Sequence, residues 1–79
     1  MENKKIKINL KDFNKVKDFI NVVRTFKSDI DLMTNRAVVD AKSVLGIYAL
    51  DLSEDTYVRI ITYSFEEERN FEESMEAFR

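Results

Sequence analysis

The chain has 79 residues, the size of one domain, and 13 Lys and Arg against 15 Asp and Glu give a net charge of −2. It contains no cysteine, histidine, proline or tryptophan. Within this chain, a disulfide framework, a Cys/His zinc site, a cysteine nucleophile and a histidine base or phosphate acceptor are therefore excluded. We expect a single domain over residues 1–79, with no cofactor and no metal ion.

The first elements change from a period of two to a helical period. Apolar and polar side chains alternate over residues 4–10, which predicts a strand with one face in the core. From Phe13 onward, apolar residues recur three or four positions apart, which predicts a helix to about Phe26. Asp12 stands just before this run, where a side-chain oxygen can cap the helix.

A hairpin is predicted next. Residues 29–33 alternate with their apolar side chains inward, and residues 37–40 form the return strand. Residues 34–36 are the turn candidate, because they contain Asn35 and asparagine tolerates a positive φ.

The last third of the chain holds two helices and one strand. Ser43 is the predicted N-cap of a short apolar helix over residues 44–51. Residues 57–63 are rich in β-branched and aromatic side chains, and residues 66–79 carry an apolar stripe at helical spacing. The order β-α-β-β-α-β-α predicts a two-layer α+β domain, with helices on one face of a mostly antiparallel sheet.

The chain has no predicted membrane segment. The longest apolar run, residues 44–50, has seven residues, far below the roughly 20 that span a bilayer. The residues after the N-terminal lysines alternate and do not form the apolar run of a signal peptide. We therefore expect a cytoplasmic protein.

Several short segments of the sequence together form a recognisable pattern. Residues 40–50 read DAKSVLGIYAL, with a Lys-Ser pair, a glycine three residues later and apolar positions around it. Residues 28–32 with Asn35, and the alternation of Val58 and Ile60, fit the same register. Together they resemble HPr, the histidine-containing phosphocarrier protein of the bacterial sugar phosphotransferase system, over nearly the whole chain. The resemblance implies an open-faced sandwich of four strands and three helices.

The resemblance also exposes a departure at the family's phosphorylation site. Asp12 stands where the phospho-accepting histidine would be, Asn14 where its arginine would be, and Lys15 replaces a proline. The resemblance therefore implies an HPr-like protein that is not an enzyme and has no phosphocarrier activity. For Asp12, a helix cap is favoured over an aspartyl-phosphate acceptor, because no acidic partner for Mg²⁺ stands nearby in the sequence.

Ser43 has two interpretations. The resemblance implies regulatory phosphorylation of Ser43 by an HPr-kinase-like enzyme. The alternative is that a serine before an apolar run is only an N-cap, a role that stabilises by about 1 kcal/mol. We treat the two interpretations as equally supported at this point.

The short helix is apolar all round, so one sheet cannot cover all of its side chains. We expect Ile47 and Leu50 to lie in the core. The resemblance implies a partner-binding surface made of Phe13, Asn14, Lys17, Val44, Leu45 and Tyr48. Whether Phe13 is buried or offered to a partner is left open by the sequence.

The expected function follows from the resemblance. It implies a regulatory or protein-interaction module linked to the phosphotransferase system and carbon metabolism, with an HPr-kinase-like enzyme or a transcriptional regulator as candidate partners. The alternative is a structural or assembly domain that dimerises or docks a partner through Leu45 and Tyr48, so we expect a monomer or a weak homodimer. Neither nucleic acid nor membrane is a predicted partner, because the overall charge is acidic and arginines are not clustered.

Overall fold

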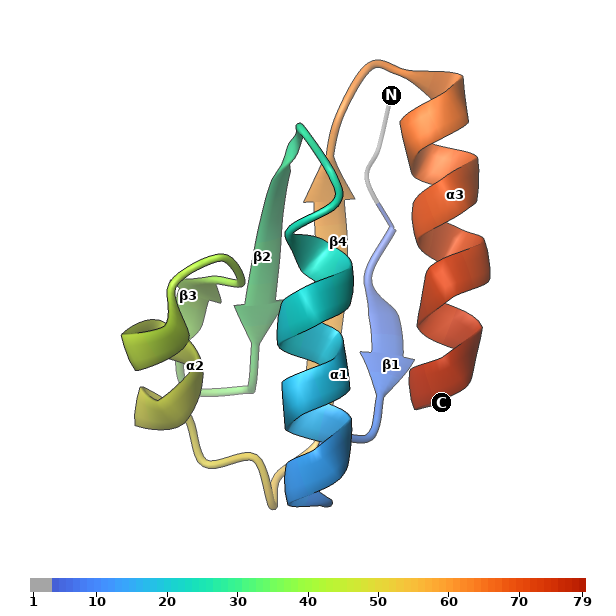
Figure 1. Cartoon of the computed structure of the whole chain (residues 1–79). Coiled ribbons are helices and arrows are strands. Elements are labelled where there is room, and N and C mark those ends of the chain that lie inside the picture. Colours follow the sequence, from blue (N-terminus) through green and yellow to red (C-terminus); the bar gives the residue numbers. More distant parts are fainter. Residues whose placement is uncertain (1–3) are drawn as a thin grey trace.

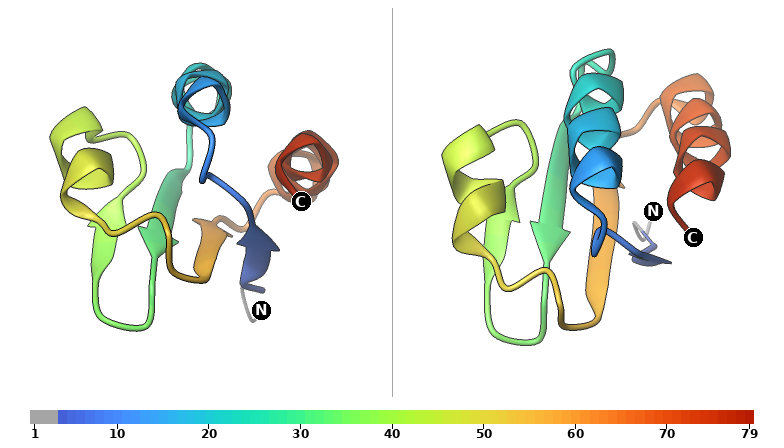
Figure 2. Two further views of the ribbon diagram at one scale, coloured as in Figure 1. Left: turned by 90° about the horizontal axis from the view of Figure 1, so that it is seen from below. Right: turned by 60° about the horizontal axis from the view of Figure 1, so that its bottom comes forward.

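The computed structural model describes residues 4–79 and has the predicted order of elements. The four strands form one antiparallel sheet in the order β1-β4-β2-β3. Three helices lie side by side on one face of this sheet, and the described part of the chain leaves the other face open (Figures 1 and 2). The elements are β1 (Ile6–Ile8), α1 (Phe13–Val23), β2 (Asp29–Met33), β3 (Val38–Asp40), α2 (Val44–Ala49), β4 (Thr56–Ile61), α3 (Phe65–Met75) and a short 3₁₀ turn (Glu76–Phe78).

The register of the sheet shows which side chains of each strand face the core, and these are the predicted ones. Val58 of β4 stands opposite Ile6 of β1 on one side and Leu32 of β2 on the other. Ile30 of β2 pairs with Ile60 of β4 two positions along. Because side chains alternate across a strand, these apolar residues all point toward the helices and form the floor of the core.

Aromatic contacts join the helical layer above that floor. The ring of Phe19 in α1 meets the ring of Phe78 edge-on, with centroids 5.6 Å apart. Phe26, just after α1, meets Phe71 of α3 in the same way at 5.7 Å. Edge-to-face pairs at this distance add to the stabilisation that burial alone provides. The stripe of α3 predicted to be apolar is therefore the face that closes the core.

The first helix ends three residues earlier than predicted. The backbone N–H groups of Thr25 and Phe26 donate to the carbonyl oxygens of Val22 and Val23, at 3.1 and 3.3 Å. The hydroxyl of Thr25 also donates to the Val22 carbonyl at 2.7 Å. These three-residue bonds tighten the chain after Val23. Phe26 is buried after the turn and not on the helix itself.

The hairpin and its turn form as predicted. No residue among 4–79 has a positive φ, so the turn does not use the left-handed conformation that asparagine tolerates. The backbone N–H of Thr34 donates to the Ala37 carbonyl at 3.0 Å, and the Thr34 hydroxyl accepts the N–H of Arg36 at 3.2 Å. A threonine side chain thus closes the turn without a strained backbone. In the same described range, no helix is long and apolar enough to cross a membrane.

Candidate functional site

Ser43 caps α2 as predicted. Its side-chain oxygen accepts the backbone N–H of Gly46 at 3.1 Å, which satisfies one of the free N–H groups at the helix start. The Ser43 residue is exposed. Its hydroxyl therefore has a structural role and is also accessible from solvent.

Gly46 lets α2 lie close to β3. A Cβ atom built on Gly46 would stand 3.3 Å from the Cβ atoms of both Val39 and Ser43. These distances are shorter than ordinary van der Waals contact between carbon atoms. The glycine of the short helix is thus explained by close packing between α2, its cap and the neighbouring strand.

The apolar side chains of α2 divide between core and solvent. Ile47 is fully buried, and Leu50 is partly buried against the core, as predicted. Leu45 is 85% exposed and Tyr48 is 51% exposed, while Val44 is 37% exposed. A helix that buries only one of its apolar faces leaves a surface suited to a partner.

The first turns of α1 carry the other side chains of the predicted partner-binding surface. A carboxylate oxygen of Asp12 accepts the backbone N–H of Asn14 at 2.8 Å, so the predicted cap is present. Phe13 is 63% exposed, which settles the question that the sequence left open. The ammonium group of Lys17 stands 6.0 Å from the centre of the Phe13 ring. The α1 group therefore combines an exposed aromatic ring with a cation.

Lys15, which replaces the proline of the family pattern, makes contacts of its own. Its ammonium group donates to the Ala77 carbonyl at 2.8 Å and lies 5.9 Å from the Phe78 ring centre. The residue thus ties the first turn of α1 to the C-terminal 3₁₀ turn.

The two exposed groups lie on neighbouring helices of one layer (Figure 1). Among residues 4–79, no hydrogen bond, ion pair or ring contact joins the α1 group to the α2 group. Val44, Leu45 and Tyr48 are brought together on α2, and Phe13 and Lys17 on α1. A partner broad enough to cross both helices could contact all of them.

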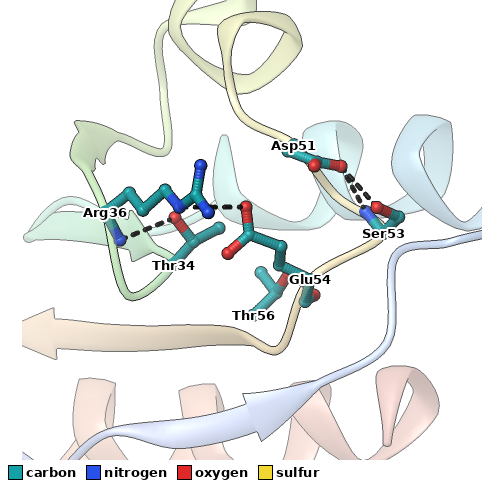
Figure 3. A network of polar contacts seen from close by, with 6 residues as sticks. All are labelled: Thr34, Arg36, Asp51, Ser53, Glu54 and Thr56. Atoms are coloured by element: carbon teal, nitrogen blue, oxygen red, sulfur yellow. Dashed lines mark hydrogen bonds and ion pairs between the residues drawn. The ribbon is translucent and has the colours of Figure 1, made fainter.

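A network beside this surface holds the loop that follows α2 (Figure 3). Asp51 accepts the N–H of Ser53 at 3.1 Å and its hydroxyl at 2.5 Å. The hydroxyl of Ser53 is the main reason that the pKa of Asp51 lies below its ordinary value. The guanidinium of Arg36 approaches the carboxylate of Glu54 at 3.9 Å, which links the hairpin turn to the same loop. These contacts hold the loop over residues 51–54, which follows α2.

Sequence reasoning missed a polar cluster centred on Glu67. One carboxylate oxygen accepts the Ser28 hydroxyl at 2.6 Å and the Ser28 N–H at 3.0 Å, and the other accepts the Lys27 N–H at 3.3 Å. The hydroxyl of Ser28, first among these groups, holds the pKa of Glu67 below its ordinary value. The sequence carries no signal for this contact, because Ser28 and Glu67 are 39 positions apart.

A known protein family matches most of the chain. A family model described as "PTS HPr component phosphorylation site" matches residues 13–79, from the first residue of α1 onward. The chain belongs to the HPr family. Members of the HPr family are phosphocarriers of the phosphotransferase system, not catalytic enzymes, and they interact with proteins of that system. No curated protein matches the chain.

Asp12 and the absence of histidine bear on phosphate transfer. The matched range begins one residue after Asp12, so the predicted equivalence of Asp12 to the HPr histidine lies just outside it. The sequence contains no histidine at any position.

Proposed function

We propose that this HPr-family protein is a protein-interaction module of the phosphotransferase system that carries no phosphate on a histidine. The observation that supports this most is the exposure of Leu45 and Tyr48 on α2, in a chain that lacks histidine. Leu45 and Tyr48 are accessible to a partner, whereas the sequence offers no histidine to carry phosphate. On this proposal the protein works in the cytoplasm, where the phosphotransferase system receives its phosphate.

The chemistry of the α2 surface favours a protein partner. An aromatic ring and an aliphatic side chain on adjacent turns match the apolar centre of a typical interface. Phe13 and Lys17 of α1 add a second ring and a positive rim. We propose that a partner with an apolar ridge and acidic margins docks across α1 and α2.

Asp12 is not a replacement phosphate carrier on this proposal. Its carboxylate already accepts the N–H of Asn14. That contact satisfies a helix N-terminus and gives a reason for an aspartate at this place without any transfer chemistry. Asp12 therefore has a capping role, and its carboxylate offers no nucleophilic nitrogen.

Ser43 is the proposed site of control. A phosphoryl group on its exposed hydroxyl would add about −1.5 to −2 charges beside Leu45 at the start of α2. Phosphate oxygens can still accept the N–H of Gly46, so the helix keeps its cap. Phosphorylation would then change partner choice while leaving the fold intact. An HPr-kinase-like enzyme and a transcriptional regulator are the proposed partners at this site.

Two phosphorylation experiments test these statements. Phosphoenolpyruvate and the first enzyme of the system should leave no acid-labile phosphate on the chain, while a histidine-containing HPr in the same tube becomes labelled. ATP and an HPr kinase should label the wild-type chain and not Ser43→Ala. Acid-labile labelling of this chain would refute the loss of carriage, and equal labelling of Ser43→Ala would refute the control site.

The docking surface is tested by substitution. Leu45→Glu and Tyr48→Glu place a charge in the centre of the surface and should weaken binding to purified phosphotransferase proteins or an HPr kinase at least about tenfold. Phe65→Glu is the matched control, because Phe65 is 75% exposed on α3, outside the surface. Unchanged binding by the α2 variants would refute the docking surface. Loss of self-association in Leu45→Glu would instead favour an assembly domain that dimerises through α2.

A further inference from the structure

One face of the sheet is turned away from the helices (Figure 2, left), and three paired residues form an apolar strip across it. Pairing places Val38 of β3, Met33 of β2 and Tyr57 of β4 side by side across three strands. Val38 is 59% exposed although it is aliphatic, and Ile61 of β4 is also exposed. Met33 belongs to this face by its pairing but is only 5% exposed, so Val38 and Tyr57 supply the accessible part of the strip.

Charges on the same face are divided between its two halves. The strands β2 and β3 contribute Asp29, Asp31 and Asp40, whereas β4 and β1 contribute Arg59 and Lys7. Arg59 pairs with Asp31 at 3.1 Å at the centre. The β3 edge of the face is thus acidic, and the β1 edge is basic.

Lys5 extends the basic edge one residue before β1. Its ammonium group lies 5.9 Å from the centre of the Tyr57 ring, which places it over the apolar strip. Lys7 is also exposed and pairs with Asp55 at 3.5 Å at the end of the strand. Asp40, at the opposite edge, is exposed. The face therefore carries an apolar row from Val38 to Tyr57, beside a charged row that runs from Asp40 at the β3 edge to Lys5 at the β1 edge.

We propose that this open face binds a second copy of the chain, face to face, about a twofold axis parallel to the strands. Such an axis turns the sheet over, so β3 of one copy faces β1 of the other and β2 faces β4. Asp40 then meets Lys5 of the other copy at both edges, and Met33 meets Tyr57 of the other copy in the centre. A twofold axis across the strands would instead place β3 on β3 and acid on acid. The charge pattern selects the first arrangement, which also keeps the strands nearly aligned, as in sheet sandwiches.

The size of the face predicts a weak dimer. The four strands have three, five, three and six residues. With about 3.3 Å per residue and about 4.8 Å between strands, they make a face of about 270 Å² for each copy. This is well below the roughly 800 Å² per partner of a standard interface, so association should be weak and should depend on concentration and salt. The inference goes beyond the proposed function, because α1 and α2 remain on the outer sides of the dimer. Two docking surfaces would then point away from each other and give avidity toward clustered partners.

Sedimentation measures the proposed association directly. The apparent mass of the wild-type chain should rise from 9.3 kDa toward twice that value as concentration increases in low salt, and fall back at about 0.5 M salt. Val38→Lys should weaken association at least about tenfold, because the proposed axis sets it against the partner's basic edge. Leu45→Glu, on the helical face, is the control and should self-associate as the wild-type chain does. A constant mass, or a dimer lost in Leu45→Glu, would overturn the proposal.

A charge exchange tests the axis itself. Asp40→Lys and Lys5→Glu should each stay monomeric, because each places like charges at both edges of its own dimer. Mixed together, the two variants should associate again, because the lysine introduced in one copy then meets the glutamate introduced in the other. The remaining wild-type pair in the mixed dimer, Lys5 and Asp40, is also opposite in charge. Failure of the mixture to associate, with both variants folded by circular dichroism, would refute this arrangement.

Discussion

At the scale of single residues, Glu67 shows how one side chain can hold three segments. Its carboxylate, in the first turn of α3, accepts bonds from Lys27 and Ser28 in the loop before β2. The Ser28 hydroxyl also approaches that of Thr62, just after β4, at 2.9 Å. The contact thus joins the ends of two strands to the start of a helix. Glu67, an acidic residue in the first turn of α3, is therefore a clamp between segments that lie 39 positions apart in the sequence.

The pH dependence of this clamp is predictable in sign. The folded-state pKa of Glu67 lies below its ordinary value of 4.5, so its stabilisation is present above that value and is lost as pH falls through the folded pKa. Glu67→Gln should therefore lower the free energy of unfolding by about 1 kcal/mol at neutral pH. The difference from the wild-type chain should shrink as the pH is lowered below 4.5.

Urea unfolding at neutral and acid pH measures this difference. Glu66→Gln is the matched control, because it removes a charge from the same first turn of α3 without touching Ser28. The change in unfolding free energy of Glu66→Gln should reflect only the lost interaction between a negative charge and the helix dipole. A Glu67→Gln penalty of the same size at both pH values would contradict the assigned role of the charge.

At the scale of elements, the position of α2 depends on Gly46. Alanine normally stabilises a helix by up to about 1 kcal/mol relative to glycine. Here the added methyl group would meet two Cβ atoms at 3.3 Å, and both are attached directly to backbone. Neither can move away by rotating a side chain. Gly46→Ala should therefore lower the free energy of unfolding by about 1 kcal/mol, measured by urea denaturation. A rise in stability would mean that α2 can shift away from β3 at little cost.

The sequence predicts the elements well because each carries its own periodic pattern. The strand of Val58 and Ile60, the stripe of α3 and the caps at Asp12 and Ser43 are all local signals, and the structure confirms them. The ends of the elements are predicted less well. The first helix ends at Val23 and not at Phe26, because Thr25 and Phe26 make three-residue bonds that its apolar spacing does not signal.

The candidate site is predictable only in part, for the same reason. The division of α2 into a buried Ile47 and an exposed Leu45 follows from a helix that is apolar all round beside a single sheet. Contacts between distant positions, such as Lys15 with Ala77 or Ser28 with Glu67, carry no periodic signal. They depend on which elements become neighbours, and that is decided by the fold as a whole.

At the scale of the whole molecule, the small core makes each buried aromatic ring important. A domain of this length is typically stable by only about 4–12 kcal/mol. Phe71 is fully buried and meets Phe26 edge-on, which joins α3 to the end of α1. Phe13 is the same residue type in the same helical layer, but its ring is mostly in solvent. The two rings therefore offer a matched pair for measuring what burial contributes.

Phe71→Ala should lower the free energy of unfolding by about 3–5 kcal/mol, because it removes the buried ring and leaves a cavity between α3 and the sheet. Phe13→Ala should change it by less than about 0.5 kcal/mol, because surface positions contribute little. Chemical denaturation followed by circular dichroism gives both values. If Phe71→Ala is too unstable to measure, Phe71→Leu should show a smaller loss with the same sign. A cost for Phe13→Ala as large as that for Phe71→Ala would mean that the Phe13 ring is buried in solution and is not available to a partner.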